Sequence, residues 1–277
     1  MPVVVVTDSS ARLPESVVAE FDIRVVPLHV LVDGRDLLDG VDEFPADLYQ
    51  RTGVSTAGAS PEQLAAAYRQ ALEDSGGDGV VAVHISGALS STVGAAELAA
   101  AELGPAVRVI DSKSAAMGTG FVALAAARAA HDGLDISAVT AHAESAVGRV
   151  RAYLVVQRLE NLRRSGRIGT AASWLGTALA LKPVLRLDDG RLVLAQRVRT
   201  TSKATAAMVE LVLDAVGEGR AALAVHHVDN PDGAAQVAAT LASALPACGP
   251  AIVTDLGPVL GVHLGPGAVA VVTALES

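Results

Sequence analysis

One change of pattern organises the chain, and it falls in Val80-Val-Ala-Val-His-Ile-Ser-Gly-Ala-Leu-Ser-Ser-Thr-Val-Gly-Ala-Ala96. The run 80–85 is apolar except for His84, which is typical of a parallel strand buried on both faces. Ser86-Gly87 interrupts this run, and small residues then continue at a composition suited to a helix. The pattern predicts a strand, a short loop and a helix, the repeating unit of a parallel α/β sheet.

Three hydroxyl residues, Ser90, Ser91 and Thr92, stand where this helix is expected to begin. Short hydroxyl side chains cap the free N–H groups of a helix start. They also suit an anionic ligand, because a helix N-terminus favours negative charge and this loop contains no acidic residue. Plain capping and a seat for an anionic group both remain open from this stretch alone.

The flanking sequence repeats the same unit. Val3–Val6 reads as a buried strand ending in a polar loop, and Ala106–Ile110 as another, each followed by a helix, from Pro14 and from about residue 115 to 130. Polar loops at the carboxyl ends of parallel strands form the usual ligand edge of such a sheet. Further elements expected in this half are a β segment over 23–32 closed by Asp33-Gly34, a helix capped by Ser60-Pro-Glu-Gln63, and a helix capped by Ser137.

A second set of elements follows residue 151. The patterns predict a strand over 153–156, helices ending at Gly166 and spanning Ser173–Leu181, a hairpin turning at Asp188-Asp-Gly-Arg191, a helix from Thr201 or Ser202 to Val216, a strand over 222–228, a helix from Pro231 to about Leu245, and strands over 251–254 and 268–274. We therefore expect two α/β domains, residues 1–150 with a mainly parallel sheet and residues 151–277.

Charge is unevenly distributed over the 277 residues. Between Arg158 and Lys203 there are ten Lys or Arg and three acidic residues, which gives this segment a net charge of +7. Because the whole chain has a net charge of −9, the remaining residues carry −16. A basic segment on an acidic body suggests an anionic ligand or an acidic partner. Nucleic acid is not expected, because the acidic remainder repels phosphate and only 3% of residues are aromatic.

Several other classes of site lack their motif. The single cysteine excludes a cysteine cluster, and His226-His227 are adjacent on an expected strand, where side chains point to opposite faces, so we expect no metal. Neither a dinucleotide fingerprint nor a P-loop is present, and no cofactor is expected. No apolar run is long enough to span a bilayer and no signal peptide is evident, so a cytoplasmic protein with at most transient membrane contact is expected.

Four further residues are candidates for binding. His263 lies within Gly257-Pro-Val-Leu-Gly-Val-His-Leu-Gly-Pro-Gly267, which we interpret as a loop of fixed shape that presents an imidazole to a carboxylate. Thr56 is a hydroxyl in a loop of small residues. Arg167 and Arg199 belong to the basic segment. Each also has an ordinary alternative, as a core histidine, a loop threonine or solvated surface arginines.

The chain resembles the DegV family of bacterial fatty-acid-binding proteins, which includes the binding subunits of fatty acid kinase. The resemblance covers almost the whole length and rests on the following motifs in order: Val6-Thr-Asp-Ser-Ser10; Thr56 with Ser60-Pro61; Ile85-Ser-Gly-Ala-Leu-Ser-Ser-Thr92; Val109-Ile-Asp-Ser-Lys-Ser-Ala-Ala-Met-Gly118; Leu159-Glu-Asn-Leu-Arg-Arg-Ser-Gly-Arg-Ile168; Leu181-Lys-Pro-Val-Leu185; Arg199 before Lys203-Ala204; and Gly257 to Ala268. The chain departs from the family at Thr56-Ala-Gly-Ala59, where the family commonly has Thr-Ser-Gln-Pro, and at Ser91, where it has glycine.

The resemblance implies that one long-chain fatty acid, of the palmitate or oleate class, is buried in the protein. Its carboxylate would be held near the junction of the two domains by hydroxyls matching Thr56 and Ser90, in loops that include Ser91 and Thr92, with His263 close by. A separate kinase subunit would convert the bound carboxylate to an acyl phosphate for phospholipid synthesis, so the chain would not be catalytic alone. Arg167 and Arg199 would lie near the carboxylate or the docking face for the kinase.

Two alternatives compete with this expectation. The first is a hydrolase of acyl or phosphate esters that uses Ser90 or Ser91 with His263, although the G-x-S-x-G turn of the α/β-hydrolases is missing. The second is a regulatory protein in which a bound lipid is only structural.

Overall fold

Two large sheets and one small sheet make up the fold of the computed structural model, which describes residues 2–168 and 182–276. The first large sheet has the strand order β2-β1-β6-β7, and all neighbours are parallel. Its strands are β1 (Val4–Asp8), β2 (Arg24–Val26), β6 (Val80–His84) and β7 (Val107–Asp111). The α/β fold with a parallel N-terminal sheet is therefore confirmed.

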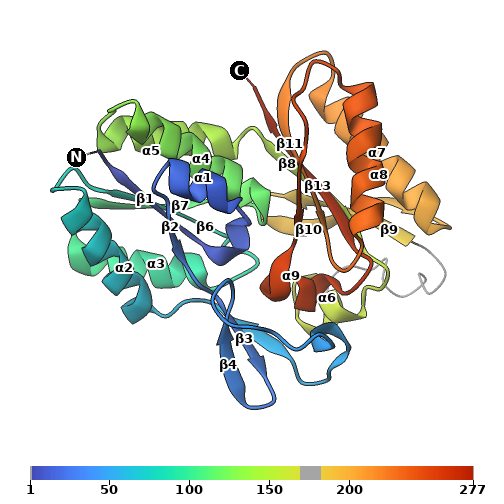
Figure 1. Ribbon diagram of the computed structural model, residues 1–277, viewed down its shortest axis with the longest axis horizontal. Helices are drawn as coiled ribbons and strands as arrows, with labels where there is room; N and C mark the ends of the chain where they lie inside the picture. Colours follow the sequence, from blue (N-terminus) through green and yellow to red (C-terminus); the bar gives the residue numbers. More distant parts are fainter. Residues whose placement is uncertain (1, 169–181, 277) are drawn as a thin grey trace.

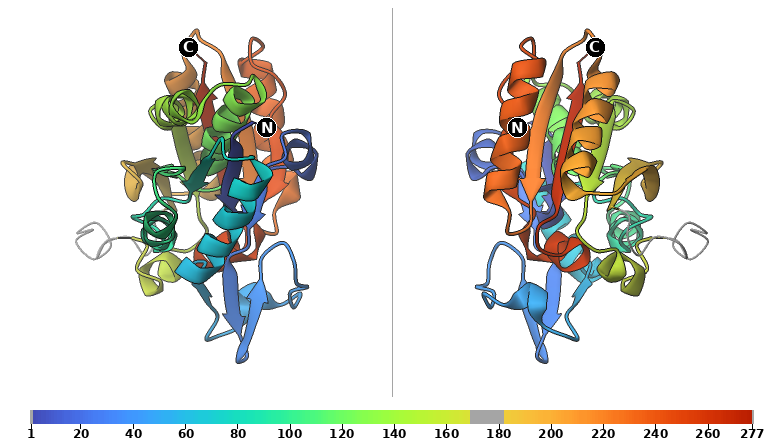
Figure 2. Two further views of the ribbon diagram at one scale, coloured as in Figure 1. Left: turned by 90° about the vertical axis from the view of Figure 1, so that its left-hand side faces the viewer. Right: turned by 90° about the vertical axis from the view of Figure 1, so that its right-hand side faces the viewer.

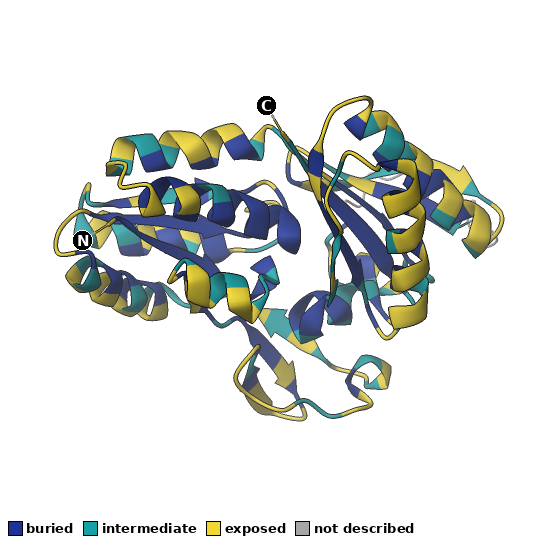
Figure 3. Cartoon of the chain, turned by 45° about the horizontal axis from the view of Figure 1, so that its top comes forward, coloured by how far each residue is buried: buried dark blue, intermediate teal, exposed yellow. Residues whose placement is uncertain are grey.

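Helices cover both faces of this parallel sheet (Figure 1). One face packs on α2 (Pro61–Asp74) and α3 (Thr92–Leu103), and the other on α4 (Met117–His131) and α5 (Ile136–Val147), while α1 (Glu15–Glu20) follows β1. Every residue of β1 and β6 is buried, which explains why both strands are apolar up to the polar residues that end them. Figure 3 shows the same layering, with dark blue strands between helices whose outer faces are exposed.

The second large sheet has the order β10-β9-β8-β13-β11-β12 and is mostly antiparallel. Its strands are β8 (Val150–Val155), β9 (Lys182–Asp188), β10 (Arg191–Val198), β11 (Ala221–His227), β12 (Ile252–Asp255) and β13 (Val269–Leu275). α7 (Thr201–Val216) and α8 (Pro231–Ala244) pack on one face, and part of the other packs on α4 around Met117 and Phe121. α6 (Glu160–Arg164) and α9 (Gly257–Leu264) lie at the end nearer the small sheet (Figure 1).

The small sheet, of order β4-β3-β5, is not foreseen by the sequence patterns. It consists of β3 (His29–Val32), β4 (Arg35–Leu38) and β5 (Ser55–Ala57). The short 3₁₀ turn η2 (Leu48–Gln50) lies between β4 and β5 in the sequence. Figure 2 shows the β3–β4 hairpin projecting away from the two larger sheets. The single β segment expected over 23–32 is wrong, because Pro27 has no N–H for a ladder and separates β2 from β3. The turn at Asp33-Gly34 is confirmed, with both residues at positive φ.

Three other local expectations need correction or lie outside the description. Asp135, not Ser137, caps α5, because its carboxylate accepts the N–H of Ala138. Thr56 is in strand β5 rather than a loop. The helix expected over Ser173–Leu181 lies outside the described residues.

The segment Gly257–Gly267, interpreted above as a loop, contains helix α9. Pro258 occupies the first turn, where a missing N–H costs nothing. Gly265 ends the helix at φ +77°, a conformation that favours glycine. Gly261 lies inside the helix, and the close approach of Tyr49 explains why this position is a glycine, since a Cβ there would lie 2.6 Å from the Tyr49 ring. The glycines therefore serve close packing and helix ends rather than a loop.

Candidate ligand-binding site

A cavity of about 870 Å³ lies between the two large sheets and the small one. Its described lining comes from the start of α2, from the loop before α3 and α3 itself, from β5, α6 and α9, and from strands β8, β9, β10 and β13 of the second sheet. Most of these side chains are alanine, valine, leucine or isoleucine, and the volume falls within the range of sites for drug-sized molecules. The cavity therefore suits a largely apolar ligand.

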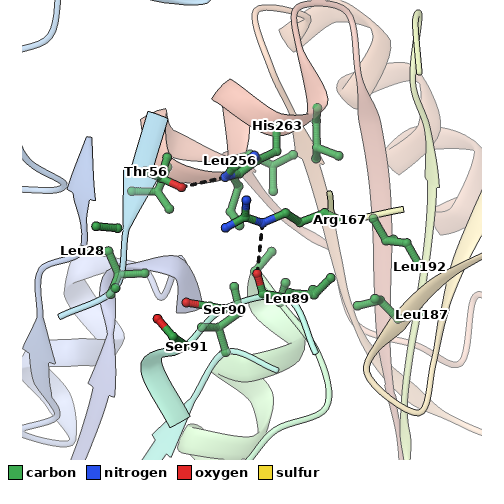
Figure 4. A pocket seen from close by; sticks show the side chains of 18 of the residues that line it. Leu28, Thr56, Leu89, Ser90, Ser91, Arg167, Leu187, Leu192, Leu256 and His263 are labelled. Atoms are coloured by element: carbon green, nitrogen blue, oxygen red, sulfur yellow. Dashed lines mark hydrogen bonds between the residues drawn. The ribbon is translucent and has the colours of Figure 1, made fainter. Parts of the chain in front are cut away.

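Thr56 and His263 meet at one end of the cavity (Figure 4). Thr56 Oγ1 and His263 Nε2 are hydrogen-bonded at 2.8 Å, although the residues are 207 positions apart. The small sheet places Thr56 opposite Val30 of β3, and α9 carries His263 to it. The other ring nitrogen, Nδ1, is buried without a hydrogen-bond partner.

His263 is neutral near pH 7. Burial, with a smaller contribution from the nearby Arg167 guanidinium, lowers the pKa of its imidazole to about 4. A neutral imidazole carries one N–H, so it either donates to the Thr56 hydroxyl or accepts from it. In the first case the hydroxyl proton of Thr56 is free to bond to a ligand.

The hydroxyls at the start of α3 divide into two kinds. Ser90 Oγ accepts the N–H of Thr92 at 3.3 Å, contacts the Thr92 hydroxyl at 2.8 Å, and lines the cavity. Thr92 is fully buried and is not among the lining residues. Ser91 is the first residue before α3, makes no capping hydrogen bond, and lies exposed at the cavity. Ser90 therefore caps the start of α3 and also lines the cavity.

Arg167 and Arg199 are in different surroundings. Arg167 is the one charged side chain among the described residues that line the cavity, and Figure 4 shows its guanidinium between His263 and Leu89. Its Nε donates to the Leu89 carbonyl at 3.2 Å, and Nη1 donates to the Ser165 carbonyl at 2.5 Å. Arg199 is exposed between β10 and α7 and is not among the lining residues.

A buried carboxylate fixes the loop that carries Ser90, and the sequence patterns missed its role. Asp8 Oδ2 accepts the N–H of Ile85 at 3.0 Å and is hydrogen-bonded to His84 Nδ1 at 2.9 Å, with both side chains fully buried. Tyr68 completes the chain through a 2.7 Å bond to His84 Nε2. The signal was available, because the expected parallel pairing of two adjacent strands places the residues that end each strand side by side.

The hydrolase alternative requires a serine bonded to the histidine. Within residues 2–168 and 182–276, the hydrogen bond of His263 goes to Thr56, not to Ser90 or Ser91. The arrangement does not assemble that nucleophile and base.

No cluster for a metal ion occurs among the described residues. His226 is buried in bonds to Thr254 Oγ1 and the Met117 N–H, whereas His227 lies 3.4 Å from Asp255, so the two adjacent histidines have separate partners. Burial lowers the pKa of His226 to about 3. In the same part of the chain, no helix has the length and hydrophobicity needed to cross a bilayer.

Comparison with known proteins gives consistent matches along the whole chain. The model of a family described as uncharacterised, the DegV family, matches residues 2–276. A DegV domain-containing protein of Mycobacterium tuberculosis is 63% identical over 271 residues, covering 98% of this chain and 96% of its own length. A DegV domain-containing protein of Streptomyces coelicolor is 40% identical over 276 residues and covers 98% of both chains.

Solved structures match in three dimensions as well. A DegV family protein from Thermus thermophilus, whose structure is described as one of fatty acid binding, superposes with a TM-score of 0.92 at 36% identity and full coverage of both chains. DegV of Bacillus subtilis, described as a fatty acid binding protein, gives a TM-score of 0.88 at 27% identity, again over the full length of both chains.

Proposed function

This chain belongs to the DegV family, and on that premise we propose that it binds a long-chain fatty acid in the 870 Å³ cavity and presents the carboxylate to a partner kinase for acyl-phosphate formation. The observation that carries the proposal is the cavity itself, apolar along most of its length and furnished at one end with Thr56, Ser90, His263 and Arg167. The relatives described as fatty acid binding support the same ligand.

Burial of the acyl tail supplies most of the affinity. Each buried CH₂ contributes about 0.8 kcal/mol, so a tail of about fifteen methylenes contributes roughly 12 kcal/mol before the costs of association. Aliphatic walls such as those from β8, β9 and α9 make no demand on the tail for hydrogen bonds. The same walls discriminate poorly against small changes in the tail, so the head group must fix the register of the ligand.

The carboxylate is held by hydroxyl donors beside a neutral imidazole. With His263 Nε2–H donating to Thr56 Oγ1, the Thr56 hydroxyl donates to one carboxylate oxygen, and Ser90 donates to the other. Arg167 adds a positive charge at the same end of the cavity. Because hydrogen bonds to a charged acceptor are worth more than those to a neutral one, this end favours the acid over its ester or alcohol.

The head group lies near the surface, where a second protein reaches it. Ser91, just before α3, and Gly94 and Leu98 of α3 line the cavity and are exposed, and Leu98 is 63% exposed despite being apolar. Arg167 and Arg199 provide positive charge for an acidic partner surface. In this proposal the chain carries out no phosphoryl transfer by itself. It acts in the cytoplasm with at most transient membrane contact, and the acyl phosphate made by the kinase enters phospholipid synthesis. We place the boundary between its two domains near residue 150.

Native mass spectrometry of gently purified protein tests the binding proposal. We expect an added mass in the range of long-chain acids, removed by delipidation and restored by palmitate or oleate. His263→Ala and Ser90→Ala should weaken rebinding of the acid, whereas Thr140→Val, which removes a hydroxyl of α5 outside the cavity, should not. A protein that is ligand-free and takes up neither acid contradicts the proposal.

Reconstitution with a fatty acid kinase subunit tests the partner. Arg199→Ala should leave oleate bound but reduce phosphorylation, since Arg199 is outside the cavity lining. Phosphorylation that is unchanged in both Arg199→Ala and Arg167→Ala removes the docking role of these arginines. Ester hydrolysis by the protein alone, abolished by Ser90→Ala, would support the hydrolase instead.

A further inference from the structure

A second cavity of about 510 Å³ adjoins the apolar one. The two cavities share three lining residues, Ala152, Tyr153 and Leu187. These residues lie on β8 and β9, at the end of the apolar cavity away from Thr56 and Ser90, and Figure 4 shows Leu187 on the opposite side of the view from both hydroxyls. A fatty acid with its carboxylate at the hydroxyls therefore points its tail toward this shared wall.

The second cavity differs in chemistry from the first. Its described lining includes the charged residues Lys113, Arg151, Arg186, Asp188 and Asp189, and four of these form two charged pairs. Lys113 Nζ lies 2.5 Å from Asp189 Oδ1, and Arg186 Nη2 lies 3.1 Å from Asp188 Oδ2. An acyl tail gains free energy only where it leaves water for an apolar environment, and the charged lining of the second cavity does not provide one. The tail is therefore stabilised up to the shared wall and not beyond it.

Leu187 is part of a hairpin whose position is fixed from the other half of the molecule. The Ser86 hydroxyl donates to the Gly190 carbonyl at 2.9 Å in the β9–β10 turn, next to the Lys113–Asp189 pair. Leu187 and Leu192 are directly opposite each other across the hairpin, and both line the apolar cavity. Of these two leucines only Leu187 also lines the polar cavity.

We propose that Leu187, together with Ala152, forms the end wall of the acyl site and sets the longest fatty acid that the protein accepts. The proposal rests on the proposed function, since it requires a fatty acid in the cavity with its head group at Thr56 and Ser90. Chains shorter than the limit gain affinity with every methylene. A longer chain must fold back or press against the wall, which close-packed interiors resist.

The test is a titration of the delipidated protein with saturated acids of increasing length, in the wild type and in three variants. In the wild type, affinity rises about fourfold per added methylene up to the limit, the equivalent of about 0.8 kcal/mol each, and then falls. Leu187→Ala moves the limit to longer chains by roughly two methylenes, because most of a side chain is removed from the wall. Ala152→Val moves it to shorter chains by filling the same end.

Leu192→Ala is the matched control, because it makes the same substitution at the cross-strand partner. It lowers affinity for all chains by a similar factor and leaves the limit where it was. Retained melting temperatures and unchanged circular dichroism show that each variant folds, and the opposite direction expected for Ala152→Val keeps the test decisive if Leu187→Ala is unstable.

The outcomes separate this inference from the function on which it rests. Binding by the wild type with no shift in Leu187→Ala or Ala152→Val, or an equal shift in Leu192→Ala, overturns the end wall and leaves the binding function intact. Failure of the wild type to bind any acid overturns the function itself.

Discussion

Replacing Thr56 with valine removes one hydroxyl from the head-group end of the cavity while nearly preserving side-chain shape. The wild-type hydroxyl is 2.8 Å from His263 Nε2, and in our account it also donates to the ligand carboxylate. A hydrogen bond to a charged group contributes about 1.5–3 kcal/mol, which corresponds to roughly a 10- to 100-fold loss of affinity for the acid. The methyl ester of the same acid carries no charge and should lose severalfold at most.

Calorimetric titration with oleate and with methyl oleate, on the wild type and Thr56→Val, forms a double-mutant cycle in which the ligand supplies the second change. Thr140→Val is the control for threonine-to-valine substitution away from the cavity. If the acid and the ester are weakened by the same factor, or if neither is weakened, Thr56 does not contact the carboxylate and our placement of the head group is wrong.

Three further predictions concern pH, packing and the buried hydrogen-bond chain. The pKa values of His226 and His263 in the folded protein are about 3 and about 4, so the unfolded chain takes up protons first and the free energy of unfolding should fall as the pH falls from about 6.5 toward 4. In urea titrations, His263→Gln should recover up to about 3 kcal/mol of this loss. A pH dependence that is unchanged in this variant would contradict the burial of the His263 imidazole. Gly58→Ala would bring a Cβ within 2.6 Å of the Thr92 hydroxyl at the start of α3, so it should cost about 1–3 kcal/mol in stability and weaken acid binding. Gly94→Ala faces open space in the same cavity and lies in a helix, so it should stabilise the protein by about 0.5–1 kcal/mol. Equal melting temperatures for the two variants would refute this packing argument. Tyr68→Phe should cost about 1–3 kcal/mol in urea unfolding, because a fully buried histidine loses its partner, and should leave oleate affinity within a few-fold of wild type; a variant as stable as the parent would show that this bond is energetically neutral.

The βα units of the N-terminal half were predictable because a local run of apolar residues marks each strand. Val80–Val83 is apolar throughout because both faces of β6 are buried, and the capping box at Ser60 and Gln63 marks the start of α2. The turn at Asp33-Gly34 is similarly local, because its positive φ values favour these residue types. Patterns of this kind report on neighbours in sequence, and they were reliable where the structure is decided by neighbours.

The parts that failed depend on contacts between distant segments. Glycines and prolines in Gly257–Gly267 are typical of a loop, but one of the glycines accommodates Tyr49 from a segment more than 200 residues away. Strand β5 has only three residues and exists because it pairs with β3. Local pattern carries no information about such partners.

The candidate site shows the same division. Thr56 and His263 were each singled out from local sequence and from the family resemblance, but their 2.8 Å contact could not be read from spacing. The cavity itself is invisible in the sequence, because leucines that line it, such as Leu187 and Leu260, are the same residue type as those that fill a core. Only the fold distinguishes a wall from a packed interior.

The most direct test of the account is the electron density of the protein crystallised with palmitate. We expect one thin, continuous ligand in the apolar cavity, with its carboxylate within hydrogen-bond distance of Thr56 and Ser90 beside His263 and its methyl end at Leu187. A cavity closed by rearranged side chains, or a ligand bound in the reverse direction with its carboxylate at the polar cavity, would contradict it.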